Sequence, residues 1–255
     1  MTERNLRVIS RLDIKSEHLV KGTQLEGLRK VGVPEDFATR YYQEGIDEII
    51  YLDIVASLYG RNSILPLIEN TAENIFVPLT VGGGIRNLES VRKALRAGAD
   101  KVAINTAAMA NPELITEVAE TFGSQCMILS IEAKSRGDGG WEAYHDNGRE
   151  HSGRDVIEWI REGIDRGAGE ILLTSVDREG VQKGMDLDLI EQVCEIAQIP
   201  VIASGGIGNL DHFKDVASQT TVDGIALAHS LHYNKLTISD LKHCAKTIPT
   251  VEVRP

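Results

Sequence analysis

An internal repeat constrains the fold of this 255-residue chain more than any other feature of its sequence. The second half repeats elements of the first at one offset of 122 residues, and the repeated elements are Pro78 and Pro200, Gly83-Gly84-Ile85 and Gly205-Gly206-Ile207, Asn87-Leu88 and Asn209-Leu210, and Glu48-Ile49 and Glu170-Ile171. Self-similarity at a fixed spacing indicates a duplicated structural unit. The sequence therefore predicts two similar halves.

Short apolar runs alternate with longer amphipathic stretches along the whole chain. The eight runs are 6–12, 47–53, 77–83, 100–106, 126–132, 169–175, 200–206 and 223–229. They are nearly continuous in apolar character, as is typical of parallel strands covered by helices. We therefore predict one domain over residues 1–255, a (β/α)8 TIM barrel with a two-fold half-barrel repeat. An open, doubly wound sheet is the alternative.

The composition excludes several classes of partner. The chain carries 38 acidic and 27 basic residues, and its net charge of −11 argues against nucleic acids and anionic membranes as main partners. No apolar stretch approaches the ~20 residues of a membrane span. The three cysteines show no pairing motif, which fits a reducing, cytoplasmic environment.

Glycine-rich turns follow the third and seventh apolar runs, at equivalent places in the two halves. Ligands of parallel barrels gather where strands end, and glycine lets the backbone N–H groups approach an anion closely. Asn105-Thr106 and His229-Ser230 add polar side chains beside these turns. One such turn alone would more simply be a tight connection, but two equivalent turns predict two phosphate sites and a substrate with a phosphate at each end.

Two carboxylates end the first strands of the two halves. Asp13 ends the first run and Glu132 ends the fifth. Opposed carboxylates of this kind are suited to general acid and base catalysis. Lys21 lies in the segment 16–33, where a lid would lie. On the residues alone, Asp13 is as readily a helix or turn cap, and Lys21 is more simply a solvated loop lysine.

The motifs RLDIK, VKG, YLDIVAS, LTVGGGIR, GADKVAINTAA, PELITE, FGSQC, GAGEILLTSVDREG and PVIASGG follow one another along nearly the whole chain. In order and spacing they resemble the cyclase subunit of imidazole glycerol phosphate synthase. A sister isomerase also has the half-barrel pattern and a substrate with two phosphates. It ranks lower because it lacks the context of FGSQC and GAGEILLTS.

The resemblance implies a lyase of histidine biosynthesis that needs no metal or cofactor. Ammonia would attack a ribulosyl aminoimidazole carboxamide nucleotide, giving imidazole glycerol phosphate and an aminoimidazole carboxamide ribotide. Asp13 and Glu132 would be catalytic. The implied substrate-binding residues are Lys21, Gly84, Asn105, Thr106, Glu179, Ser204, Gly205, Gly206 and His229 within the stretch 228–230.

The chain departs from the family at several of these positions. Glu132 and Glu179 stand where aspartates are usual, Val55 and Val181 replace threonines, and His229 interrupts a run of small residues. A displaced carboxylate can be costly to rate. The departures favour an alternative, a paralogous ammonia-dependent enzyme that amidates another substrate such as a nucleotide sugar. A barrel that only scaffolds a glutaminase is a third possibility, against which the intact Asp13 and Lys21 argue.

Four charged residues begin the first, second, fourth and sixth strands, and they are Arg7, Glu48, Lys101 and Glu170. Two acids and two bases from neighbouring strands can close a ring that only stabilises the barrel, as polar residues at this end usually do. The resemblance implies instead a gate through which ammonia enters from a docked glutaminase. Because the chain shows no glutaminase nucleophile motif, the glutaminase would be a separate subunit of a heterodimer.

Overall fold

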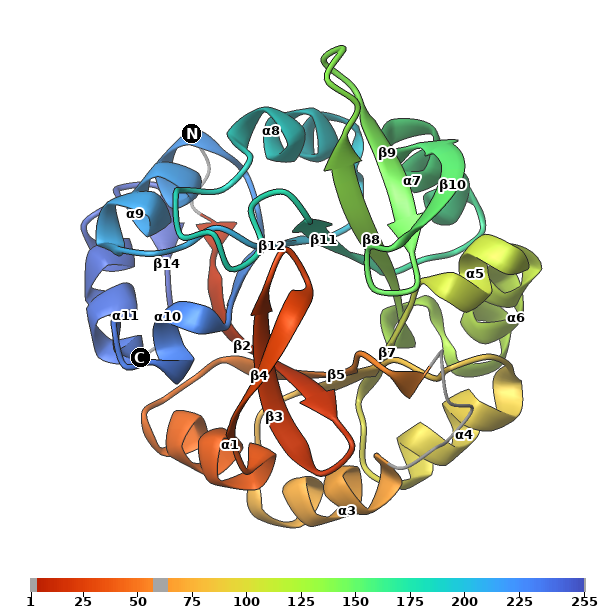
Figure 1. The fold of residues 1–255 in the computed structure, drawn as a ribbon, viewed down its shortest axis with the longest axis horizontal. Coiled ribbons are helices and arrows are strands. Elements are labelled where there is room, and N and C mark those ends of the chain that lie inside the picture. Colours follow the sequence, from red (N-terminus) through yellow and green to blue (C-terminus); the bar gives the residue numbers. More distant parts are fainter. Residues whose placement is uncertain (1–3, 57–63, 255) are drawn as a thin grey trace.

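The computed structural model describes residues 4–56 and 64–254, and within them eight parallel strands close into a barrel (Figure 1). The strands are β2 (Arg7–Lys15), β5 (Glu48–Asp53), β6 (Leu79–Gly82), β7 (Lys101–Ile104), β8 (Met127–Ser135), β11 (Glu170–Ser175), β12 (Val201–Ser204) and β13 (Gly224–Leu227). Pairing of β7 with β8 and of β13 with β2 completes the ring. The predicted barrel is confirmed, and the open sheet is wrong.

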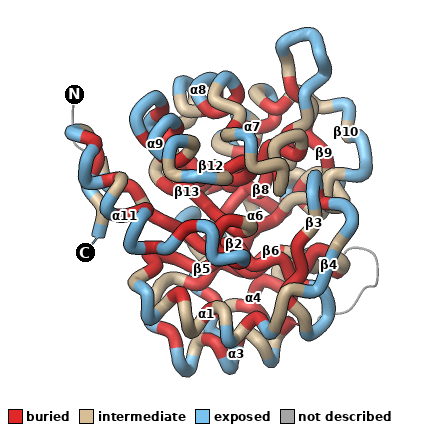
Figure 2. The backbone as a smooth tube through the Cα atoms, turned by 60° about the vertical axis from the view of Figure 1, so that its left-hand side comes forward, coloured by how far each residue is buried: buried red, intermediate tan, exposed pale blue. Residues whose placement is uncertain are grey.

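Helices surround the barrel and shield the outer faces of its strands (Figures 1 and 2). They are α1 (Pro34–Gln43), α3 (Leu65–Asn74), α4 (Leu88–Arg96), α5 (Thr106–Ala110), α6 (Glu113–Phe122), α7 (Val156–Asp165), α8 (Leu187–Ile196), α9 (Leu210–Gln219), α10 (His229–His232) and α11 (Ile238–Lys246), with a 3-10 turn at Ser124–Cys126. The repeat is visible in the caps. Asn87 accepts the Ser90 N–H at 3.0 Å to begin α4, and Asn209 accepts the His212 N–H at 2.9 Å to begin α9.

Each half carries an antiparallel hairpin on its first strand. Strands β3 (His18–Thr23) and β4 (Glu26–Gly32) continue from β2, and β9 (Trp141–His145) and β10 (Glu150–Asp155) continue from β8. The segment 16–33, expected to be a lid without periodic structure, is thus largely the first hairpin. The hairpin tips meet, since Asn147 Nδ2 donates to the Leu25 carbonyl at 3.3 Å. At the other end, β1 (Arg4–Asn5) pairs with β14 (Val251–Glu252).

The interior of the barrel is stacked in three layers, because every second residue of a strand points inward. Charged residues lie at the N-terminal end. An apolar layer follows, formed by Ile9, Ile50, Ala103, Ile128, Leu172, Ile202 and Ala226. Polar side chains, among them Arg11, Thr174 and Ser204, then lie above the apolar layer and bond to one another. The polar layer at the C-terminal end is where the candidate site is built.

Candidate active site

Asp13, Lys21 and Glu179 come together at the C-terminal mouth of the barrel. Lys21 Nζ lies 2.9 Å from Asp13 Oδ2 and also bonds to Glu179 Oε1. Asp13 comes from β2, Lys21 from β3, and Glu179 from the loop after β11. Lys21 is only 3% exposed, so it is not a solvated loop lysine, and Asp13 accepts bonds from side chains rather than capping a turn.

Arg11 is a fourth member of this cluster, and it was missed in the sequence. Its Nε donates to Asp13 Oδ1 at 2.8 Å, and its Nη1 lies 3.0 Å from Thr174 Oγ1 and 3.3 Å from Ser204 Oγ. The signal was present, because the sequence analysis used Arg7 and Asp13 of the same strand, which are separated by an even number of residues. Alternation along a strand places residue 11 on the same face.

The charges of this buried cluster stabilise one another. Burial alone would raise the pKa of Asp13, but the Arg11 and Lys21 cations outweigh it and hold that pKa far below its usual range. Burial would lower the pKa of Lys21, and the carboxylates of Asp13 and Glu179 raise it by more. Asp13 is therefore ionised and Lys21 protonated at neutral pH.

Glu132 lies at the mouth in a different environment. Its Oε2 accepts the Gly148 N–H at 2.7 Å from the turn between β9 and β10. Within the part of the chain that the structure describes, no lysine or arginine forms an ion pair with it. Burial raises the pKa of Glu132 to about 7, opposed by the Gly148 N–H and by the more distant Arg11. Glu132 can therefore exchange a proton near neutral pH.

A cavity of about 620 Å³ opens beside the first glycine-rich turn. Gly83, Gly84, Asn105 and Thr106 line it together with Arg11, Ser130 and Glu132. Gly83 has a φ of +84°, and a Cβ there would lie 2.0 Å from the Asp53 carbonyl oxygen, so only glycine fits. Asn105 and Thr106 already bond to the hairpin backbone, at Tyr144 O (3.1 Å) and Asp146 N (3.1 Å).

The second glycine-rich turn has little open space beside it. Gly205, Gly206 and His229 line a cavity of only about 20 Å³. Glu179 reaches into this region, since a Cβ built on Gly205 would lie 3.1 Å from Glu179 Oε2. His229 Nε2 lies 3.2 Å from Gln182 Nε2. The two turns that the sequence paired are therefore equivalent in place but not in accessibility.

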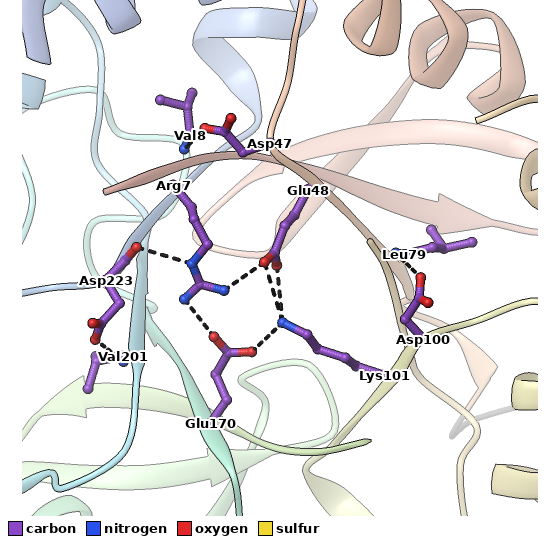
Figure 3. Close-up of polar contacts among 10 residues, drawn as sticks. All are labelled: Arg7, Val8, Asp47, Glu48, Leu79, Asp100, Lys101, Glu170, Val201 and Asp223. Atoms are coloured by element: carbon purple, nitrogen blue, oxygen red, sulfur yellow. Dashed lines mark hydrogen bonds and ion pairs between the residues drawn. The ribbon is translucent and has the colours of Figure 1, made fainter. Parts of the chain in front are cut away.

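The four charged residues at the opposite end form a closed ring (Figure 3). Arg7 lies 2.7 Å from Glu48 and 2.6 Å from Glu170, while Lys101 lies 3.3 Å from Glu48 and 2.8 Å from Glu170. Nearby aspartates accept backbone N–H groups of neighbouring strands, as Asp100 does from Leu79 at 2.8 Å. The structure thus brings together all four residues that the sequence placed at this end.

These features define a class of protein, the (β/α)8 barrels, whose ligand sites lie at the C-terminal ends of the strands. Residues 7–237 match the sequence model of a family described as "Histidine biosynthesis protein", and the chain belongs to that family.

Three relatives that the chain resembles carry the same name. It is 59% identical to "Imidazole glycerol phosphate synthase subunit HisF" of Legionella pneumophila over 210 residues, which are 82% of this chain and 99% of that protein. It is 47% identical to the protein of the same name from Gluconacetobacter diazotrophicus over 237 residues, 93% of this chain and 92% of the relative. The match with the Streptococcus sanguinis protein is 44% over 236 residues, 92% and 94% of the two chains. The resemblance read from the sequence motifs is confirmed.

Residues 4–56 and 64–254 contain no group of three or more His, Cys, Asp or Glu side chains placed to hold a metal ion. No helix in that part of the chain is long and apolar enough to cross a membrane.

Proposed function

We propose that this chain is the cyclase subunit of imidazole glycerol phosphate synthase. In the proposed reaction, ammonia and a ribulosyl aminoimidazole carboxamide nucleotide give imidazole glycerol phosphate and an aminoimidazole carboxamide ribotide. The observation that carries the proposal is the juxtaposition of Glu132 with the 620 Å³ cavity at the first glycine-rich turn, beside the Asp13–Lys21 pair.

The residue roles follow from what each group offers. Gly84, Asn105 and Thr106 would bind one phosphate through the turn and the N-terminus of α5. Ser204, Gly205 and Gly206 would bind the second, with the backbone of 228–230, once the Glu179 carboxylate moves aside. Asp13 and Glu132 would be the catalytic carboxylates, and Lys21 would hold the substrate from above. No step in this proposal requires a metal or a cofactor.

We propose further that a separate glutaminase docks at the N-terminal face and forms a heterodimer with this chain. A hollow of about 720 Å³ lies there beside the charged ring, lined by Asn5, Arg7, Glu48, Lys246 and Arg254 among others. Polar side chains around a concave surface suit a subunit contact of this kind. Ammonia would enter between Arg7, Glu48, Lys101 and Glu170. We place the complex in the cytoplasm, where its phosphorylated substrate would be found.

A direct assay tests the proposal. Purified chain is incubated with the ribulosyl nucleotide and an ammonium salt, and the two products are followed by chromatography. Expression in a strain that lacks the cyclase and requires histidine gives an independent readout. Turnover and rescued growth are expected, and failure of both in folded protein would reject the proposal.

One observation favours a second candidate, an ammonia-dependent enzyme that amidates another substrate such as a nucleotide sugar. The cavity at the second turn, which Glu179 helps to line, measures only about 20 Å³, whereas a substrate with two phosphates needs both turns. Parallel incubation with a nucleotide sugar that bears a carboxylate, together with glutamine, a glutaminase and ATP to activate the carboxyl oxygen as a leaving group, would separate the candidates. Conversion of that sugar without conversion of the ribulosyl nucleotide would favour the second.

A further inference from the structure

We propose that Arg11 is a positioning residue that holds Asp13 as a fixed anion, so that Glu132 alone exchanges protons with the substrate. The inference rests on the proposed function and assigns different roles to two carboxylates that the repeat presents as equivalents.

Both oxygens of the Asp13 carboxylate accept a hydrogen bond from a cationic side chain. Arg11 Nε reaches one oxygen at 2.8 Å, and Lys21 Nζ reaches the other at 2.9 Å. Both are charge-assisted bonds, which are the stronger kind. A proton that arrives on Asp13 must displace one of these cations from an oxygen that is otherwise buried. Proton exchange at this carboxyl is therefore opposed on both sides.

Arg11 is itself held in place by hydrogen bonds to neighbouring barrel strands. The side chain is 2% exposed and extends from β2 across the barrel interior, where Thr174 on β11 and Ser204 on β12 accept from its Nη1. The guanidinium lies one inward-facing position above Ile9 of the apolar layer. Leaving Asp13 would cost Arg11 its partners on three strands. The cation that fixes Asp13 is thus itself fixed by the barrel.

The Glu132 carboxylate, unlike that of Asp13, forms no ion pair with a described residue. The residue two positions before Asp13 is Arg11, whereas the residue two positions before Glu132 is Ser130, whose side chain is uncharged. Glu132 lines the cavity and accepts one bond, from the Gly148 backbone. It has no ion pair with any cation in the described residues. Its proton can leave and return without breaking a salt bridge.

The surrounding charges support this division. Arg11, Lys21 and the buried ring of His232 face Asp13, with Glu179 beyond Lys21, and the two cations dominate. Asp146, Asp13 and the more distant Arg11 face Glu132. Burial lowers the pKa of His232 to about 3, so this ring is neutral and adds no third cation. The Asp13 cluster pairs two cations with two anions, and removing Arg11 leaves it with an excess negative charge.

The decisive experiment needs no substrate. Protein labelled with 13C at the aspartate side-chain carboxyl is titrated by NMR from about pH 3 to about pH 9, a range that includes the pKa of an ordinary aspartate, and the Asp13 signal is identified by its absence in Asp13→Asn. In the parent this signal should not titrate. In Arg11→Met, which keeps the volume and removes the charge, the midpoint should lie at least about one pH unit higher than in Arg11→Lys, a tenfold change in proton affinity.

A matched variant separates charge from packing. Thr174→Val removes one anchor of Arg11 and leaves its charge, so the Asp13 signal should stay as in the parent. Titration of Asp13 in the parent within this range, an equal midpoint in Arg11→Met and Arg11→Lys, or an equal rise in Thr174→Val and Arg11→Met would each overturn the proposal. If Arg11→Met does not fold, the parent, Arg11→Lys and Thr174→Val still decide whether Asp13 titrates.

The pH dependence of kcat then tests whether the charge of Arg11 affects the reaction. With unprotonated ammonia held constant, kcat of the parent should depend on one group with a pKa near 7, and that dependence should vanish in Glu132→Gln. Arg11→Met should lose about tenfold in kcat and gain a second ionisation, and Arg11→Lys should recover most of the loss. Persistence of the dependence near pH 7 in Glu132→Gln would reject Glu132 as the proton carrier. Absence of turnover with the ribulosyl nucleotide would reject the proposed function and leave the NMR result on Arg11 standing.

Discussion

The two halves of the barrel share a backbone plan and differ in what their side chains do with it. Gly83 packs against the carbonyl of Asp53, and Gly205 packs against that of Ser175, the same pair of positions 122 residues later. Yet the first turn opens onto about 620 Å³ and the second onto about 20 Å³. The two halves therefore share the position of the turn, and the side chains around each turn, Glu179 among those of the second, determine how open it is.

The two carboxylates at equivalent strand ends, Asp13 and Glu132, also differ in their surroundings. Asp13 on β2 lies between two cations, whereas Glu132 on β8 accepts one backbone N–H. The first arrangement favours a permanent charge and the second favours proton exchange near neutral pH. Equivalent strand ends thus have different electrostatic environments.

The largest effect should come from Asp13→Asn. An amide cannot balance the charges of Arg11 and Lys21, so ammonium-dependent turnover should fall by about 10²-fold or more. The free energy of unfolding should also fall, by about 3 kcal/mol, because two buried cations keep only Glu179 as an anionic partner. Steady-state kinetics and urea denaturation measure the two effects.

The matched control is Asp47→Asn, which breaks a buried pair with Lys242 (2.8 Å) far from the mouth. It should lose comparable stability and keep its turnover with ammonium salt. Near-normal turnover of Asp13→Asn would show that the charge of Asp13 plays no part in the reaction.

Lys101→Ala tests the opposite end of the barrel. It removes a cation that lies 2.8 Å from Glu170, and should lower glutamine-dependent turnover on the order of tenfold while ammonium-dependent turnover stays close to that of the parent. Both activities are measured on one folded preparation with the glutaminase present. An exposed lysine variant on α4, Lys93→Ala, is the control. Equal loss of both activities, or no binding of a glutaminase, would mean that the ring only stabilises the barrel.

The eight barrel strands were predictable because each can be recognised from the residues of its own segment. Continuous apolar runs identify strands buried on both faces, and the repeat fixed their register between the halves. The first hairpin was missed because β4 is largely exposed and carries no apolar alternation, so its pairing with β3 has no periodic signal.

The site was predictable only in part. Strand ends meet in any parallel barrel, which is why Asp13 and Glu132 could be assigned to one end of the barrel from the residues, whereas Lys21 and Glu179 were assigned to the site only through the family resemblance. Arg11 was accessible to the same reasoning through strand alternation. The small size of the second cavity was not, because it depends on how the side chains around that turn, Glu179 and His229 among them, are placed in three dimensions.

Phosphate binding tests the difference between the two turns. In crystals soaked with inorganic phosphate, the ion should occupy the first turn of the parent, at Gly84, Asn105 and Thr106. The second turn should bind phosphate about tenfold more tightly in Glu179→Ala than in the parent, because a like charge is removed from beside it. Isothermal titration gives the stoichiometry and affinity. Occupancy of the second turn in the parent, with the first empty, would reverse the comparison.

The smallest effect concerns the stability of the half that carries Glu132. Burial raises the pKa of Glu132 in the folded chain from 4.5 to about 7, so folding favours its protonated form. The stability that this protonation contributes is fully present below pH 4.5 and is lost as the pH rises through about 7. Above that range the folded parent carries a half-buried charge at position 132, whereas Glu132→Gln carries none. Glu132→Gln should therefore be more stable than the parent at about pH 8 by roughly 1–2 kcal/mol, a value reduced for the partial exposure of the side chain. The difference should shrink as the pH falls toward 4.5.

Urea denaturation of both proteins across this range measures it, and Glu195→Gln on the exposed face of α8 controls for loss of a surface charge. A difference that does not change with pH would mean that Glu132 ionises as an ordinary carboxyl, and the two halves would then not differ in the way their carboxylates hold protons.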